Sequence, residues 1–82
     1  MTTRKNSAAR FVICIDNSEY PASLELHKLY RVISDKEAER EGDLRVIDES
    51  GEDYLYPSDY FAPVELPRTV IRALRKTYAR NI

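Results

Sequence analysis

The sequence predicts a mainly β domain, a small five-stranded barrel followed by a C-terminal amphipathic α-helix, and three observations favour this fold class. Five short runs rich in β-branched and aromatic residues lie between residues 11 and 66, and turn-forming residues separate them. From residue 67 onward the apolar residues change to a helical spacing. The chain has 82 residues, enough for one domain, and closing so small a sheet into a barrel removes its exposed edges.

The first half of the chain predicts two strands and a solvated excursion. Phe11–Ile15 is almost continuously apolar, as expected of a strand buried on both faces, and the turn-forming pair Asp16–Asn17 ends it. A loop around Pro21 leads to a second β-branched run, Leu29–Ile33. Residues 35–43 hold no large apolar side chain, so we expect them to be solvated and to form one helical turn at most.

The second half predicts three more strands. Leu44–Ile47 is a third β-branched run, and the hairpin turn after it centres on Ser50–Gly51, because glycine adopts a positive φ without penalty. Tyr54–Tyr56 predicts a fourth strand that ends at a proline. We expect a short turn or a single 3₁₀ turn at residues 58–61 and a short fifth strand, Val64–Leu66, between two prolines.

Residues 67–82 predict an amphipathic helix of roughly 12–14 residues, which a proline at its start favours. At 100° per residue, the apolar side chains fall within about 120° of one another and the basic ones lie opposite or at the border. A helix of this length is marginal alone in water, so we expect its apolar stripe to dock on the barrel or on a second copy, forming a homodimer. The stripe comprises Val70, Ile71, Leu74, Tyr78 and Ile82.

The net charge of −1 conceals a strong segregation of charge along the chain. Residues 1–10, expected to be a flexible basic arm, carry three bases and no acid. Residues 11–67 carry five bases and all fourteen acids, whereas residues 68–82 carry five bases and no acid. Such basic ends either fold back on the acidic body or bind an anionic partner. The candidate anion-binding residues are Arg68, Arg72, Arg75, Lys76 and Arg80.

What the sequence lacks excludes several classes of protein. No apolar run approaches the roughly 20 residues that cross a bilayer, and none after the basic N-terminus is long enough for a signal peptide. One cysteine, Cys14, and one histidine, His27, are too few for a disulfide framework or a Cys/His zinc site. Because there is also no glycine-rich phosphate loop and no catalytic grouping around His27, we expect a cytoplasmic protein that is not an enzyme and has no cofactor or metal.

The six tyrosines and the hairpin acids are the remaining concentrations of one residue type. We expect Tyr30 and Tyr56 to fill the edge of the core and to send their hydroxyls to water. Tyr20 and Tyr60 lie in segments with little else that is apolar, so they are candidates for a surface contact. Cys14 predicts a buried, inert thiol. The hairpin carboxylates are expected to be solvated rather than to bind a metal: Asp48, Glu49, Glu52 and Asp53.

Two stretches carry a resemblance to Src-homology-3 domains. Tyr54-Leu-Tyr-Pro-Ser-Asp-Tyr-Phe-Ala-Pro-Val64 resembles the closing segment of that family, in which a strand runs into a Pro-Ser-Asn-Tyr turn; Asp59 stands where the family usually has Asn. Ser23-Leu-Glu-Leu-His-Lys-Leu-Tyr-Arg-Val-Ile33 resembles its diverging turn and second strand. The resemblance spans residues 11–66 and implies a Src-homology-3-like barrel, in the style of small bacterial versions of this domain.

The resemblance also implies a binding surface, although an incomplete one. The family's ligand groove uses a tryptophan, which this chain lacks, and the first strand here carries none of the groove tyrosines. Pro57 and Tyr60 match groove positions, and Tyr20 is placed to join them from the first loop. Glu19 and the acids of residues 37–43 would flank this surface, an arrangement that prefers a basic ligand.

The sequence therefore predicts a non-catalytic interaction module that binds a peptide or protein through a tyrosine and proline surface. An alternative is a small nucleic-acid-associated regulatory protein that binds phosphates through the basic C-terminal helix. A third possibility is that this helix lies on an anionic membrane surface.

Overall fold

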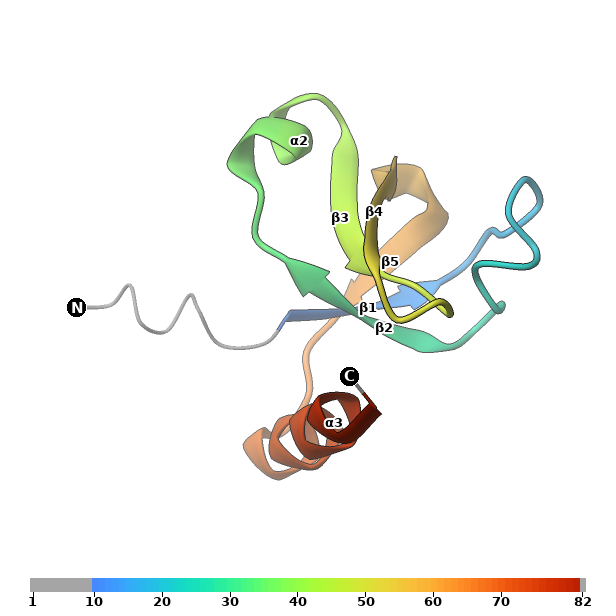
Figure 1. The fold of residues 1–82 in the computed structure, drawn as a ribbon. Helices are drawn as coiled ribbons and strands as arrows, with labels where there is room; N and C mark the ends of the chain where they lie inside the picture. Colours follow the sequence, from blue (N-terminus) through green and yellow to red (C-terminus); the bar gives the residue numbers. More distant parts are fainter. Residues whose placement is uncertain (1–9, 82) are drawn as a thin grey trace.

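The computed structural model describes residues 10–81, and side chains as far as residue 74 and at residue 76 (Figure 1). Five antiparallel strands form one sheet in the order β4-β3-β2-β1-β5. The strands are β1 (Arg10–Cys14), β2 (Leu29–Ile33), β3 (Asp43–Ile47), β4 (Asp53–Pro57) and β5 (Phe61–Val64). The helices are α2 (Lys36–Arg40), the 3₁₀ turn η1 (Ser58–Tyr60) and α3 (Arg68–Asn81).

The mainly β fold with a C-terminal helix is confirmed, and the first four strands begin and end within one residue of their predicted limits. The predicted position of the fifth strand is wrong. We expected it at Val64–Leu66 because Pro63 would interrupt a strand, but β5 is Phe61–Val64 and includes that proline. Pro63 is tolerated because its nitrogen does not face β1. The Ile15 N–H donates to the Tyr60 carbonyl at 2.8 Å, and in the alternating register the Val12–Pro63 pair then makes no hydrogen bond.

The sheet is open rather than closed, so the predicted closure into a barrel is wrong. β4 and β5 are consecutive in the chain, but β4 pairs with β3 and β5 pairs with β1 at the opposite end of the sheet. Both edges carry a proline whose nitrogen faces outward. Pro63 occupies this position on β5, and Pro57 occupies it on β4, because Ser58 N–H bonds to the Gly42 carbonyl and leaves the Asp43–Pro57 pair unbonded. Each edge therefore lacks a backbone donor that pairing would need.

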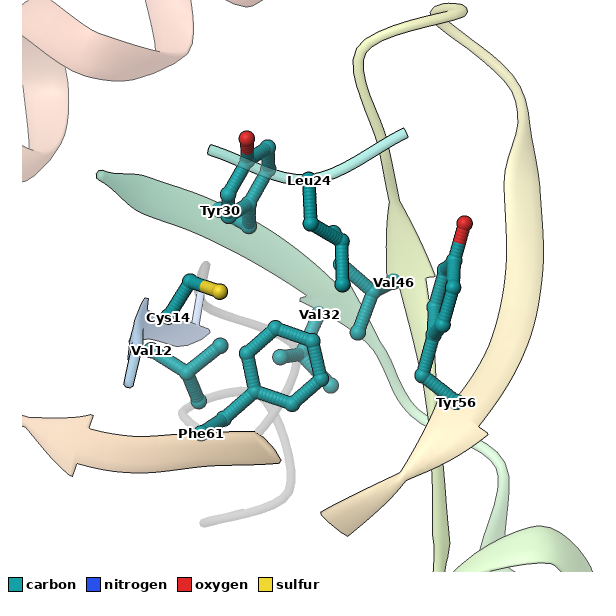
Figure 2. Close-up of a cluster of buried hydrophobic side chains, with 8 residues drawn as sticks. All are labelled: Val12, Cys14, Leu24, Tyr30, Val32, Val46, Tyr56 and Phe61. Atoms are coloured by element: carbon teal, nitrogen blue, oxygen red, sulfur yellow. The ribbon is translucent and has the colours of Figure 1, made fainter. Parts of the chain in front are cut away.

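The core lies on one face of the curved sheet (Figure 2). Leu24, from the loop between β1 and β2, is fully buried over the strands, so this loop folds across the core face. Cys14 is fully buried, as predicted, and its burial raises the pKa of the thiol. The cluster comprises Val12, Cys14, Leu24, Tyr30, Val32, Val46, Tyr56 and Phe61.

The excursion between β2 and β3 forms one short helix, α2, at the position where at most one turn was predicted. Asp35 caps it, accepting from the Ala38 N–H at 3.1 Å, and Arg45 of β3 bonds to the same carboxylate at 2.8 Å. The excursion is not wholly solvated, because Ala38 is buried. Arg10 pairs with Glu39 at 3.0 Å, which ties the start of β1 to this helix.

The opposite face of the sheet adjoins the start of α3. Phe11 is buried on this face, which confirms that β1 is covered on both sides. Ile71 of α3 lines a cavity of about 420 Å³ together with Phe11 and Val64. Ile71 and Leu74 are half-buried, whereas Val70 and Arg72 are exposed. Figure 1 shows α3 as a separate rod joined to the sheet by an extended segment.

Parts of two predictions lie outside the described residues. The basic arm predicted for residues 1–10 is described only at Arg10, which belongs to β1. The side chains of Arg75, Tyr78, Arg80 and Ile82 also lie outside the description.

Candidate functional site

The loop from Asp16 to Lys28 is shaped by its own polar side chains. The Asp16 carboxylate accepts from the Ser18 N–H and hydroxyl at 3.0 and 2.8 Å, and these bonds lower the pKa of Asp16. Asn17 donates across the loop to the Leu24 carbonyl at 2.9 Å. The Tyr20 carbonyl accepts from the Leu24 N–H at 3.0 Å, so the buried leucine anchors the backbone that carries Tyr20.

The structure brings Tyr20 and Tyr60 together, 40 positions apart in the sequence. Their ring centroids are 6.0 Å apart with the planes tilted by 55°. Tyr60 ends η1, and Pro57 precedes this turn with its ring exposed. The sequence analysis predicted that these three residues share one surface. That prediction did not include Tyr56, whose ring centroid lies 5.1 Å from that of Tyr20, with the ring planes at 83°.

Acidic groups border this surface. Partial burial raises the pKa of the Tyr60 hydroxyl, and the charges of Glu19 and Asp16 raise it further. The Asp16 N–H donates to the Tyr60 carbonyl at 3.3 Å, so this acid lies next to Tyr60. At the other end, the Gly42 carbonyl accepts from the Ser58 N–H at 2.9 Å, so the acidic excursion ends beside the turn that follows Pro57. A cation is therefore electrostatically favoured over an anion here.

The hydroxyls of Tyr30 and Tyr56 bond to the carboxylates of Glu49 and Asp48, which corrects the prediction that they would be directed to water. Both rings are buried, and Figure 2 shows the two hydroxyls directed toward the same side of the core. Tyr30 donates to Glu49 and accepts from the Glu25 N–H at 2.7 Å. Burial first, and then the bond to Asp48, raise the pKa of Tyr56 to about 12; burial and Glu49 also raise the pKa of Tyr30.

Of the four hairpin acids only Asp48 is buried, contrary to the prediction that all four would be solvated; Glu49 is exposed but ion-paired. Asp48 is only 6% exposed and accepts from the Ser50 N–H and hydroxyl at 2.9 and 2.6 Å. Burial opposes its ionisation, but the bonds from Ser50 and Tyr56 outweigh burial and lower its pKa. Glu49 pairs with Lys28 at 2.7 Å, and this lysine and Tyr30 lower the pKa of Glu49. Glu52 and Asp53 are exposed, and Asp53 pairs with Arg45 at 3.0 Å.

The sequence analysis did not predict a cavity that Tyr20 lines. It has a volume of about 350 Å³ and lies where the hairpin turn meets the first loop. The one available signal was that Tyr54 and Tyr56 point to the same side of their strand. The approach of this strand to Ser23 and Tyr20 depends on tertiary structure. The lining residues are Tyr20, Ser23, Asp48, Ser50, Tyr54 and Tyr56.

The basic residues of α3 do not converge with the tyrosines in any contact within the described part of the chain. Arg68, Arg72 and Lys76 are exposed, and none of them makes an ion pair with another described residue. On β2, the buried Nε of Arg31 has no hydrogen-bond partner among residues 10–81.

The remaining observations are negative and concern the described residues alone. No group of three or more His, Cys, Asp or Glu side chains within residues 10–81 is placed to hold a metal ion. No helix in the same range is long and apolar enough to span a membrane. In comparisons with known proteins, no family model, no curated protein and no solved structure matches the chain.

Proposed function

We propose that this protein is a non-catalytic interaction module that binds an extended segment of a partner protein through Tyr20, Pro57 and Tyr60. The observation that carries the proposal is the 6.0 Å approach of the Tyr20 and Tyr60 rings, with Pro57 exposed at the start of the turn that Tyr60 ends. Tyrosine offers a rigid apolar ring with a polar tip, and it anchors many protein interfaces at low entropic cost. The Tyr20 backbone is held by the core through Leu24, so the surface is largely formed before a ligand arrives.

The charge around this surface indicates the partner's chemistry. Glu19 and Asp16 lie near Tyr60, and no basic side chain is paired with either among the described residues. A ligand with lysine or arginine beside an apolar residue complements such a rim, and the attraction speeds association at low salt. We therefore propose a basic segment as the ligand.

We also propose that the chain is a Src-homology-3-like domain whose strands do not close into a barrel. The strand order and the 3₁₀ turn after Pro57 support this kinship. The missing tryptophan speaks against ordinary proline-rich ligands, because an aromatic-lined slot for a polyproline helix would be incomplete.

Selection from a random peptide library, followed by affinity measurement, tests this function. Peptides selected on the wild-type protein are expected to be basic, and Tyr20→Ala and Tyr60→Ala are each expected to weaken their binding by at least about tenfold, as for an interface anchor. Leu55→Ala serves as the matched control, because Leu55 is an exposed apolar residue on β4 that is outside the tyrosine cluster. Equal affinity of wild type and both tyrosine variants would exclude this surface as the binding site.

A second candidate function is nucleic-acid binding by α3, favoured by its three exposed, unpaired bases within the described residues. Phosphate contacts would make affinity fall steeply with salt, by roughly one power of salt concentration per phosphate. Fluorescence anisotropy with duplex DNA and with RNA at about 50 mM and 200 mM salt separates this function from the first. Binding that is lost in the triple variant Arg68→Ala, Arg72→Ala, Lys76→Ala would support it, and absence of binding at low salt would remove it.

A further inference from the structure

We propose that the cavity beside Tyr20, here called the Tyr54 pocket, binds an alkylammonium group, such as the end of a lysine side chain of a partner. Tyr20 lines this pocket, whereas Tyr60 is not among its lining residues. Its volume of about 350 Å³ is within the range of small-ligand sites. The inference goes beyond the proposed function, because a free amine can occupy this pocket whether or not the Tyr60 surface binds a peptide.

The walls of the Tyr54 pocket are aromatic and meet at a corner. The rings of Tyr20 and Tyr56 are nearly perpendicular, at 83° and 5.1 Å between centroids. Tyr20 and Tyr54 are 42% and 49% exposed, so their rings remain accessible, whereas Tyr56 is buried behind them. Aromatic faces attract cations through the ring quadrupole, and the attraction grows when the site is partly desolvated. An apolar ligand would gain contact area from these rings but not this attraction.

The pocket also contains a buried negative charge that no cation neutralises among the described residues. Hydrogen bonds to its carboxylate from neutral donors, the Ser50 N–H and hydroxyl and the Tyr56 hydroxyl, hold the pKa of Asp48 below its usual range. The ion pairs of the described residues involve other acids, and none reaches Asp48. Glu52, which accepts from the Tyr54 hydroxyl at 3.1 Å, adds a second carboxylate beside that ring. A positive ligand group is thus attracted by both the carboxylates and the rings.

The hydrogen bonds already made by Asp48 favour an ammonium over a guanidinium. A carboxylate has about four lone-pair sites, and three donors already occupy the carboxylate of Asp48. A guanidinium binds best as a fork to two free acceptors, which this carboxylate does not offer. An ammonium needs only scattered acceptors, and Ser23 and Ser50, whose hydroxyl oxygens each have two lone pairs, are among the lining residues. A quaternary ammonium needs none and is attracted by the ring faces alone.

An NMR titration with small probes tests the pocket without knowledge of the partner. The probes are choline, its neutral isostere 3,3-dimethylbutan-1-ol, n-butylammonium and methylguanidinium. We expect choline and butylammonium to shift the ring resonances of Tyr20 and Tyr54, with dissociation constants about tenfold lower than that of the neutral alcohol, as a partly desolvated cation–π site allows. Methylguanidinium is expected to bind more weakly than butylammonium. Equal binding of choline and the alcohol would overturn the proposal, as would shifts confined to residues outside the lining.

Two variants test whether choline binds in the Tyr54 pocket. Tyr54→Leu keeps an apolar side chain at an exposed position and is expected to weaken choline binding at least about threefold, because one ring face is lost. Leu55→Ala, the next residue on the same strand, faces away from Tyr54 and is expected to leave choline binding unchanged. Undiminished choline binding by Tyr54→Leu would overturn the proposal. Failure of the proposed function leaves a different pattern, in which Tyr60→Ala does not alter peptide affinity while choline still binds.

Discussion

The hydroxyl of Tyr56 donates a 2.5 Å hydrogen bond to the carboxylate of Asp48, and both residues are buried. Asp48 directly follows β3, and Tyr56 lies in β4, so the bond joins the hairpin turn to the core. The Tyr56 ring also contacts the rings of Tyr20 and Phe61, with centroids 5.1 and 6.3 Å away. One residue therefore connects the turn, the core and the candidate binding surface.

Tyr56→Phe is expected to lower the free energy of unfolding by about 1–3 kcal/mol, because it leaves a buried carboxylate without one of its donors. Urea denaturation measures the change. Tyr54→Phe is the matched control, since the hydroxyl of Tyr54 bonds to the exposed Glu52 and not to a buried acid within residues 10–81. A loss below about 0.5 kcal/mol in Tyr56→Phe, within the range of neutral surface changes, would show that the bond does not stabilise the fold.

Stability is expected to fall as the pH is lowered through the folded-state pKa values of Asp48 and Glu49. Both pKa values are lower in the folded protein than in the unfolded chain, where they lie at about 4. The two carboxylates therefore contribute their full stabilisation above that pH, and the contribution is lost as the pH falls further. Lys28→Met removes the cation beside Glu49 and is expected to make this fall shallower. Lys36→Met, at an exposed position on α2, is the control. Parallel pH profiles for wild type and Lys28→Met would contradict the assignment.

His27 has a φ of 65°, and its N–H donates to the Cys14 carbonyl at 2.7 Å. Histidine and asparagine tolerate this region, whereas β-branched residues are strongly disfavoured there. We expect His27→Val to cost about 1–3 kcal/mol of unfolding free energy and His27→Asn to cost less than about 0.5 kcal/mol. Urea denaturation of both variants beside Leu26→Val, at an exposed neighbouring position, measures this. An equal cost for His27→Val and His27→Asn would argue against a backbone origin.

The outward-facing nitrogen of Pro63 is expected to keep the β5 edge from pairing with other chains. The Phe61 N–H on the same edge already bonds to the Ser58 carbonyl, so within the described strand no outward donor remains. Pro63→Val adds a donor and is expected to cause concentration-dependent association in light scattering. Ala62→Val, whose N–H faces β1, is the control. A monodisperse Pro63→Val protein at the concentrations where wild type is monodisperse would refute this role.

The strands were predictable because local composition determines them. The runs at Phe11–Ile15 and Leu29–Ile33 are β-branched and bounded by turns, and they form β1 and β2 almost as expected. The prediction for β5 was wrong because it treated Pro63 as the boundary of the strand. A strand tolerates proline where the proline nitrogen faces away from the paired strand. That information lies in the pairing of β5 with β1, not in the local sequence.

The candidate site was predictable only in part. Tyr20, Pro57 and Tyr60 were identified from the resemblance and from their apolar character in polar segments. The partners of the buried tyrosine hydroxyls, Asp48 and Glu49, were not predicted. Their local sequence is typical of a solvated turn, and it does not show that the hairpin packs against the first loop. The Glu49 N–H bonds to the Ser23 carbonyl at 3.0 Å, and this long-range contact brings the acids to the tyrosines.

Chemical-shift mapping with a peptide selected on the wild-type protein is the most direct test of the binding surface. The predicted result is that the largest perturbations fall on Tyr20, Tyr60 and the loop around Glu19, with α3 little affected. Perturbations centred on Arg68, Arg72 and Lys76, with Tyr20 and Tyr60 unmoved, would contradict the proposal that the tyrosine surface is where this protein meets its partner.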